Sequence, residues 1–433
     1  MALTIQSPQA PNGWRPSGND LYYSLTSDQT AQSGFYYLID VQINDITVIT
    51  LRKYPVTGAT INVNVREIID SYITTQFFNG GQYMDGVVIF PTDFLKCVVI
   101  GTEFYNGQTY STATTPPIYI WNAAAPFDVE QANQLNNYER NFINYIQSGN
   151  VYLPRPMGYN SFISPNDLIV NNGNVYATTE ALSMAYPTNR HWQRPISFLC
   201  LPIFLRYAVF LGLDSEGKAI KKYVRPTYVQ NNSKIITAIF GGGLLASNFP
   251  VTFAAPGTDV SNMNDCSYIV FYYAENYTDL TDNDKIYTKP VIFQMGDCSE
   301  SFGILYKSFE GGFNMVQCNR RATQETNIET ITRENIKPLN WSTDTRLIST
   351  ANVNAAGKWV LNTDWVTESI NKDINDMIQS PLIWIMHYKD GQTQYIPVTL
   401  INANYTTKQY NDVNLFNYSF EFAEAYFKNT IRQ

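Results

Sequence analysis

Apolar and polar residues alternate with a period of two over much of this 433-residue chain. The clearest example begins at Phe35, from which every second residue through Ile43 is aromatic or aliphatic, as in a strand with one buried face. Clusters of Gly, Asn, Asp and Pro, such as Asn106-Gly107, separate these segments at the spacing of a β-sandwich. Further strands are predicted at Ile46–Arg52, Thr60–Val65, Gly86–Phe90, Leu95–Tyr105, Ile118–Trp121, Leu201–Gly212, Ile220–Val229, Lys234–Phe240, Cys266–Glu275, Ile286–Phe293, Leu382–Tyr388, Thr393–Asn402 and Leu415–Phe422.

Helical periodicity occurs in three segments. Residues 127–147 predict the longest helix, with Asp128 as N-cap and apolar residues at helical spacing until Gly149. An amphipathic helix is predicted at Val366–Ile378 and a short one at Arg66–Tyr72. The fold class is therefore mainly β, with several β-sandwich-like modules, a few short helices and one longer linking helix.

Changes in pattern divide the chain into five parts. Each boundary falls where a periodic segment gives way to a stretch rich in turn-forming residues. The parts are an N-terminal arm (1–33), an N-terminal β-sandwich (34–126), a helix with an irregular linker (127–165), a middle β domain (166–300) and a C-terminal α+β module (301–433).

Residues 1–33 contain few aliphatic side chains and many Pro, Gly and Ser residues. Such a segment lacks the material for a core of its own, so we expect it to be ordered by contacts with a neighbouring subunit. The alternative is that it folds back on the N-terminal sandwich as an edge strand. The candidate interface residues are the large side chains and the cation of this segment, Trp14, Arg15, Tyr22, Tyr23 and Leu25.

The composition changes the picture in one respect, because charge is scarce. Only 15% of residues are charged, whereas 43 are Asn and 31 are Tyr. Amides and phenol rings are desolvated more cheaply than ions, so this surface suits a protein packed among other subunits, unless the composition only reflects an AT-rich genome. The net charge of −8 and the pI near 4.9 argue against nucleic-acid binding.

Localisation signals are scarce as well. The N-terminal sequence shows no signal-peptide pattern, so we expect synthesis in a cytoplasm. No run of 18 apolar residues is present, so no membrane span is expected. The five cysteines form no CxxC pair and are expected to be reduced thiols rather than disulfides or zinc ligands: Cys97, Cys200, Cys266, Cys298 and Cys318.

The closest approach to a catalytic motif is the segment from Gly212 to Ala219, which has the spacing of a phosphate-binding loop. Ala219 replaces the hydroxyl that would hold magnesium, and Asp214 and Glu216 would repel a phosphate. A hairpin turn between two strands explains the segment better.

Two sets of carboxylates are candidates for other chemistry. Asp279, Asp282 and Asp284 could ligate calcium, but the chelating Glu and the turn Gly of a known calcium loop are missing. Asp373 and Asp376 could form a glycosidase-like pair, but on an amphipathic helix we expect a solvated face.

Only two histidines are present, His191 and His387, and His387 is expected to be structural, within a strand. We therefore expect no catalytic residues, no metal and no cofactor.

The C-terminal part resembles the corresponding module of tail and baseplate-like virion proteins from phages of the Bacteroidetes group, including crAss-like phages. The resemblance is carried by Glu310-Gly311-Gly312-Phe313-Asn314, by Ser380-Pro381 after a helix, by Pro397-Val398-Thr399-Leu400 and by Phe420-Glu421-Phe422-Ala423-Glu424-Ala425. Trp14-Arg15-Pro16 with Asn19 and the strand from Phe35 are similar to the N-terminal modules of those proteins. The resemblance covers about half of the chain and does not extend to residues 321–365.

The resemblance implies a non-enzymatic structural subunit of a phage tail, such as a hub, collar or baseplate component. Its expected partners are other tail proteins and further copies of itself in a ring around the tail axis, and its expected location is the virion. The alternative is a glycan-binding receptor-recognition protein at the tail tip, in which exposed Tyr and Trp rings stack on sugars. A third class, a glycosidase or peptidoglycan-degrading subunit, requires two carboxylates that converge in a cleft.

Overall fold

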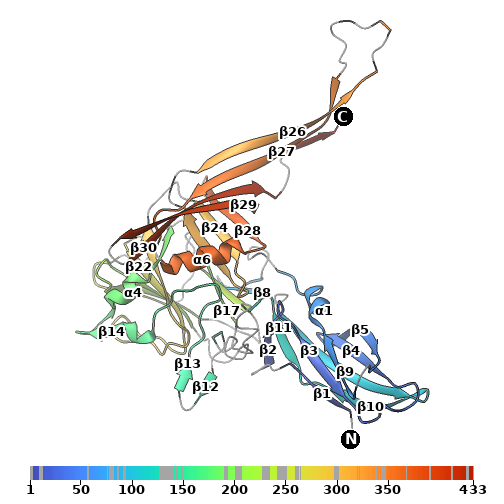
Figure 1. The fold of residues 1–433 in the computed structure, drawn as a ribbon. Helices are drawn as coiled ribbons and strands as arrows, with labels where there is room; N and C mark the ends of the chain where they lie inside the picture. Colours follow the sequence, from blue (N-terminus) through green and yellow to red (C-terminus); the bar gives the residue numbers. More distant parts are fainter. Residues whose placement is uncertain are drawn as a thin grey trace.

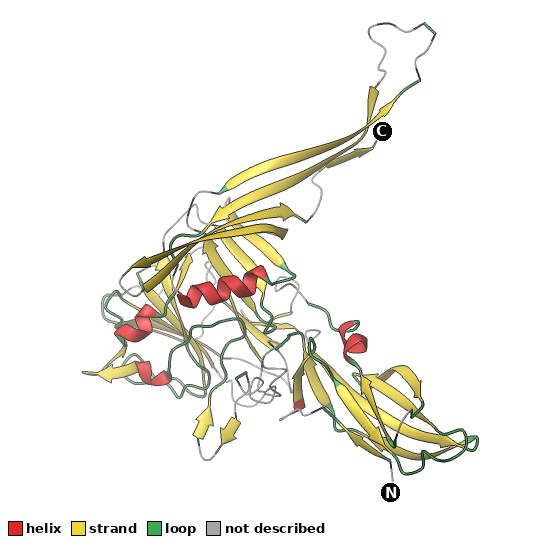
Figure 2. Cartoon of the chain, viewed as in Figure 1, coloured by secondary structure: helices red, strands yellow, loops and turns green. Residues whose placement is uncertain are grey.

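The computed structural model describes most of the chain. Strands predominate and helices are few, as Figure 2 shows. The predicted mainly β fold, with several multi-stranded sheets, is confirmed. The described residues are 3–8, 13–55, 58–75, 77, 82–84, 87–90, 94–125, 141–142, 145–147, 150–189, 194–199, 207–226, 235–240, 251–258, 263, 265–296, 302–318, 320, 322–336, 339–340, 342, 348–366, 368–389, 392–410, 413–425 and 429–432.

The N-terminal unit consists of two sheets around one hydrophobic core. One sheet has the order β1-β3-β6, and the other has the order β2-β11-β9-β4-β5 with β10 also paired to β9. Side chains along β9 alternate in burial, so that Leu95, Cys97 and Val99 enter the core. The elements are β1 (Thr4–Gln6), β2 (Trp14–Pro16), β3 (Tyr22–Thr26), β4 (Tyr36–Ile43), β5 (Ile46–Lys53), β6 (Thr60–Asn64), α1 (Arg66–Asp70), β9 (Phe94–Tyr105), β10 (Gln108–Thr114) and β11 (Ile118–Trp121).

Two of the hairpins in this unit close through residues that tolerate a left-handed backbone. Asn44 and Asp45 have φ values of 50° and 67°, and Asn106 and Gly107 have values of 49° and 77°. Positive φ at both central residues is typical of the type I′ turn, whose twist matches that of the paired strands. The turn predicted at Asn106-Gly107 is confirmed.

The described residues between 3 and 33 belong to this unit, so the prediction of a detached N-terminal arm is wrong. β1 pairs with β3, β3 pairs with β6, and β2 pairs in parallel with β11. Leu3, Leu21, Tyr23 and Leu25 enter the core that later strands build. A segment too poor in apolar residues to form a core can still complete one, and the fold-back alternative is therefore the correct one.

The middle unit contains a six-stranded sheet that is covered on both faces. On β18 and β22, alternate residues enter two different hydrophobic clusters, so both strands are buried throughout and read as continuous apolar runs. The sheet order is β16-β23-β22-β18-β19-β21. The strands are β16 (Tyr186–Asn189), β18 (Tyr207–Leu213), β19 (Ala219–Pro226), β21 (Val251–Ala254), β22 (Tyr268–Ala274) and β23 (Val291–Gly296).

Smaller elements surround this sheet. A four-stranded sheet has the order β17-β20-β8-β7, so two strands from the first hundred residues pair with the middle unit. The expectation that the Gly86–Phe90 strand belongs to the N-terminal sandwich is wrong, because its backbone partner is β20. The elements are β7 (Gln82–Met84), β8 (Val87–Phe90), β17 (Arg194–Leu199), β20 (Ile235–Phe240), the β14–β15 hairpin (Leu168–Asn171 and Asn174–Ala177), a 3₁₀ turn (Pro165–Asp167) and α4 (Thr179–Ser183).

Most of the helix predicted over 127–147 lies outside the described residues. Its last three residues form strand β12 (Tyr145–Gln147), which pairs with β13 (Asn150–Tyr152). That end of the prediction is wrong, because the backbone of these residues pairs with the following strand rather than with a preceding helical turn.

The C-terminal unit is built on one large twisted sheet. Its order is β25-β24-β28-β29-β30-β27-β26, with β31 also paired to β27, and helix α6 packs against it. The predicted helix and the last three predicted strands are confirmed as α6 and β28–β30. In Figure 1 the β26–β27 hairpin extends away from the rest of the molecule, with the C-terminus beside it. The elements are β24 (Phe302–Lys307), β25 (Phe313–Cys318), β26 (Thr323–Glu334), β27 (Ile348–Asn362), α6 (Glu368–Ile378), β28 (Ile383–Lys389), β29 (Gln392–Tyr410), β30 (Val413–Glu424) and β31 (Asn429–Arg432).

Candidate functional site

The turn between β24 and β25 lies where the three units meet. Gly311 has a φ of 99°, and a Cβ on Gly312 would lie 2.6 Å from the carbonyl oxygen of Met157. Glycine is therefore required at both positions, at Gly311 for its backbone and at Gly312 for the close approach. Nε1 of Trp121 donates to the backbone carbonyl of Glu310 at 3.0 Å. The backbone N–H of Ala124 donates to the backbone carbonyl of Phe309 at 2.7 Å. The Glu-Gly-Gly sequence thus joins the N-terminal unit to the C-terminal one.

The carboxylate of Glu310 holds a loop of the linker against this turn. Nη1 of Arg155 donates to Glu310 Oε2 at 3.0 Å, and Nη2 donates to Oε1. The backbone N–H of Gly158 also donates to Glu310 Oε2, at 2.7 Å. The side chains of Glu310 and Arg155 are 5% and 14% exposed. A bidentate pair of this kind fixes geometry as well as charge.

Arg194, on β17, occupies the centre of the region and is 1% exposed. Its guanidinium donates to Tyr159 Oη, to the carbonyls of Pro187 and Met315, and to Asn314 Oδ1 at 3.0–3.2 Å. All four acceptors are neutral. Aromatic rings surround the same cation, with that of Tyr186 5.0 Å away.

Helix α6 brings two carboxyl groups to this region. Asp373 and Asp376 are 1% and 4% exposed. Asn160 Nδ2 donates to Asp373 Oδ1 at 2.6 Å, and the N–H of Phe309 donates to Asp376 Oδ1 at 3.1 Å. Neither Oδ2 has a hydrogen-bond partner among the described residues. Burial raises the pKa of each carboxyl to about 7.

The expectation that these two residues form a solvated face is wrong. The apolar stripe of α6, which includes Ile374 and Met377, packs on the sheet. Beside the stripe, the linker covers Asp373 and the β24–β25 turn covers Asp376. Carboxyls with a pKa near neutrality are suited to acid–base chemistry. Here both contact protein groups and are shielded from solvent, so they join the helix to the linker and to the β24–β25 turn.

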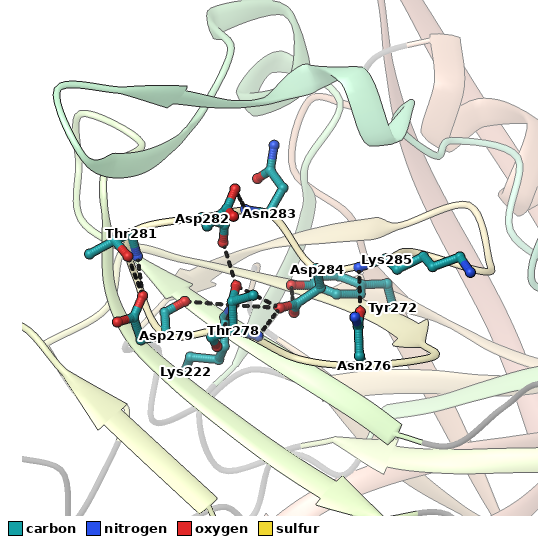
Figure 3. A network of polar contacts seen from close by, with 10 residues as sticks. All are labelled: Lys222, Tyr272, Asn276, Thr278, Asp279, Thr281, Asp282, Asn283, Asp284 and Lys285. Carbon is teal, nitrogen blue, oxygen red and sulfur yellow. Dashed lines mark hydrogen bonds and ion pairs between the residues drawn. The ribbon is translucent and has the colours of Figure 1, made fainter.

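The three acidic residues that were candidate calcium ligands do not converge on one point: the carboxylate of Asp284 contacts a lysine, whereas those of Asp279 and Asp282 accept from Thr281 and Asn283 (Figure 3). Nζ of Lys222, on β19, donates to Asp284 Oδ1 at 3.1 Å and to the carbonyls of Thr278 and Asp279 at 3.2 and 2.9 Å. The side chains of Lys222 and Asp284 are 1% and 0% exposed. Tyr272 donates to the other oxygen of Asp284 at 2.7 Å.

The ammonium of Lys222 therefore takes the carboxylate oxygen and the two carbonyl oxygens that this loop directs inward. Burial lowers the pKa of Lys222, and the nearby charge of Asp284 counteracts that shift. Over the described part of the chain, no group of three or more His, Cys, Asp or Glu is arranged to hold a metal ion.

The segment that resembled a phosphate-binding loop is a hairpin turn, as the sequence favoured. β18 and β19 pair antiparallel across it, and Asp214 Oδ1 accepts from the backbone N–H groups of Glu216 and Lys218, each at 2.9 Å. A carboxylate thus fills the position where a phosphate would have to bind.

The candidate interface residues of the N-terminal segment lie mostly inside the chain. Trp14, Arg15, Tyr23 and Leu25 are at most 6% exposed, and Tyr22 is 51% exposed. Trp14 packs against Tyr119 and Trp121, with ring centroids 5.3 and 6.3 Å apart. Their burial belongs to the chain's own core, so the proposal that they anchor a detached arm is corrected, and Tyr22 alone of the five presents a largely open side chain.

The remaining predicted positions agree with the structure where it describes them. Cys97, Cys266 and Cys318 are buried free thiols, whereas Cys200, Cys298 and His191 lie outside the described residues. His387 is in strand β28 and stacks on Phe302 with a centroid distance of 4.6 Å. Among the described helices, none combines the length and the apolar character that crossing a membrane requires.

Sequence reasoning missed the burial of Lys222 and of Asp373 with Asp376. An adjacent Lys221-Lys222 pair within an apolar strand was the available signal for the first site, because an ion on a fully buried strand needs a partner. The comparisons with known proteins add no further signal: no family model matches this sequence, and no curated protein is similar to it.

Proposed function

We propose that this chain is a non-enzymatic structural subunit that assembles with further copies of itself and with neighbouring proteins. The observation that carries the proposal is the hairpin of β26 and β27, which extends beyond the body of the molecule in Figure 1. Near its far end, Ile336 and Leu339 are 96% and 103% exposed, and Ile348 is 63% exposed. Exposed aliphatic side chains gathered on a projecting element are typical of an interface with another protein.

The edge of the sheet supports the same proposal. β26 is the last strand in the sheet order and, among the described strands, pairs with β27 alone. Its 12 residues include no Pro, so every residue of the strand keeps its backbone N–H donor. Such an edge offers backbone donors and acceptors to a strand of a neighbouring subunit.

The particular assembly that we propose is a phage tail, in which copies of this chain form a ring as a hub, collar or baseplate component. This finer proposal is supported by the resemblance of the two terminal parts to tail and baseplate-like proteins and by the low charge of the chain. A projecting hairpin that contacts a different surface of the next copy is a head-to-tail contact, and such contacts form a ring when the rotation between successive copies closes.

Removing the projecting part of the hairpin tests the proposal. In one variant, Asn-Gly replaces residues 331–352 and joins Thr330 to Val353, which are direct partners in the ladder. We expect an unchanged melting temperature and the loss of assembly, measured by light scattering during size-exclusion chromatography and by electron microscopy.

A point variant provides a matched comparison. Ile336→Ser with Leu339→Ser should weaken assembly, whereas Ile46→Ser on β5, where the side chain is 68% exposed, should not. A wild-type chain that stays monomeric alone and with candidate tail proteins, or a shortened hairpin that assembles normally, would contradict the proposal.

A further inference from the structure

A pocket of about 270 Å³ lies between helix α6 and strands β29 and β30. It is separate from the buried carboxyl groups on the other side of the helix. Among the side chains that the structure describes, none of those that line it is charged. Its lining residues are Asn371, Asn375, Ile378, Ala403, Phe416 and Tyr418.

Two of the polar groups of the pocket, Asn371 and Tyr418, are held in place before any ligand arrives. Tyr418 Oη donates to Asn371 Oδ1, which orients that carboxamide and leaves its Nδ2 to donate to a ligand. Asn375 follows Asn371 by one helical turn, so both amides lie on the same face of α6. Asn375 is exposed at the mouth of the pocket.

The two walls are also fixed relative to each other. The segment that leads into α6 bonds to β30: Val366 and Phe416 exchange backbone hydrogen bonds of 2.8 and 3.0 Å, and Tyr418 N–H donates to Thr363 Oγ1 at 2.9 Å. A rigid pocket avoids much of the ordering cost of binding.

These features define the chemistry of the ligand. Two carboxamides and a phenol oxygen suit hydroxyl groups, while Phe416, Ile378 and Ala403 suit the apolar face of a ring. The described lining residues carry no charge, which disfavours a phosphate or a carboxylate. The volume is just below the range of roughly 300–1,000 Å³ that drug-sized ligands occupy, so it suits a single ring.

We propose that this pocket binds one neutral hexopyranose unit of a glycan. The inference goes beyond the structural role proposed above, and it gives the glycan-recognition alternative a defined location. A subunit can carry such a site whether or not it forms a ring.

Saturation-transfer NMR and calorimetry on the full chain test the site. The probes are the methyl glycosides of glucose, galactose, mannose and N-acetylglucosamine, each supplied separately, and a short neutral oligosaccharide of the sugar that binds best. We expect at least one glycoside to bind with a Kd on the order of 1 mM, as is reasonable for a small ligand with few contacts. Tighter binding of the oligosaccharide identifies a glycan chain, rather than the free sugar, as the ligand.

Two variants locate the binding. Asn375→Ala removes an exposed amide and introduces Ala, which favours the helix, so the fold should persist. We expect the Kd to rise about tenfold. Ala403→Met fills the pocket and should abolish binding. Gln379→Ala removes an exposed amide at the end of the same helix, outside the lining, and should leave the Kd unchanged.

Binding of no glycoside, or binding that both pocket variants leave unchanged, would overturn the proposal. Circular dichroism establishes that each variant is folded. Because binding is measured by a signal from the sugar and assembly by mass, failure of this site leaves the proposed structural function standing, and the reverse also holds.

Discussion

Two of the regions in which the chain buries acidic side chains neutralise them differently. In the middle unit, Asp284 contacts the ammonium of Lys222 directly, and Tyr272 donates to its second oxygen. On α6, Asp373 and Asp376 each keep one oxygen without a partner among the described residues, and the nearby guanidinium of Arg194 bonds only neutral acceptors.

The difference shows two ways of removing a carboxyl group from water. In the first, a bonded cation balances the charge of Asp284 at the cost of burying a second ion. Without such a partner, the α6 carboxyls resist ionisation, and burial raises the pKa of each to about 7. The second region is therefore expected to be sensitive to pH near neutrality.

The largest expected loss of stability follows from breaking the ion pair of the first region. Lys222→Met leaves Asp284 buried without its cation, and we expect the free energy of unfolding to fall by about 3–5 kcal/mol. Urea denaturation at neutral pH measures the loss. Adding Asp284→Asn to the same variant should recover part of it, and a single variant as stable as the wild type would show that the ion pair is not the stabilising element.

An effect opposite in sign is expected at α6. The folded-state pKa of about 7 lies above the ordinary value of 3.8, so the stabilising contribution of each protonated carboxyl is complete below 3.8 and is lost as the pH rises through 7. The loss amounts to about 1.4 kcal/mol per carboxyl for each pH unit in that interval.

Asp373→Asn removes one titrating group and keeps an oxygen to accept from Asn160. We expect this variant to be more stable than the wild type at about pH 8 and to show a flatter pH dependence of urea unfolding. Asp364→Asn, at a side chain that is 58% exposed, is the control and should retain the wild-type slope. A slope that Asp373→Asn does not change would show that this carboxyl does not titrate in that range.

The smallest effect belongs to an exposed neighbour of the first region. Lys285 pairs with Glu275, but its side chain is 61% exposed. Lys285→Met should change the melting temperature far less than Lys222→Met does, because water already solvates both charges. Equal effects of the two variants would mean that burial does not distinguish these two ion pairs.

Local chemistry was enough to predict some features of the fold. The prediction of a turn at Asn106-Gly107 is confirmed, because these are two of the few residue types that tolerate a left-handed backbone. Helix α6 is correct because its apolar positions repeat at helical spacing. The hairpin at Asp214 is correct because the surrounding residues form strands rather than a helix.

The errors concern contacts between residues that are distant in the sequence. The periodicity of α6 gives its apolar stripe, but the burial of Asp373 depends on Asn160, which is 213 positions away. The burial of Lys222 depends on Asp284, 62 positions away. The composition of the N-terminal segment shows that it cannot form a core alone. It does not show that the strands within residues 35–120 build a core that this segment completes.

The pairing of β8 with β20 has a consequence for synthesis on the ribosome. β8 ends at residue 90, and its partner β20 begins at residue 235. At about 5–20 residues per second, β8 emerges roughly 7–30 seconds before its partner exists. During that time the surrounding N-terminal strands can already pair, while the edge of β8 that β20 will cover stays available to other nascent chains. Folding of this subunit therefore includes an interval in which a chaperone that shields unpaired strands would raise the yield of native protein.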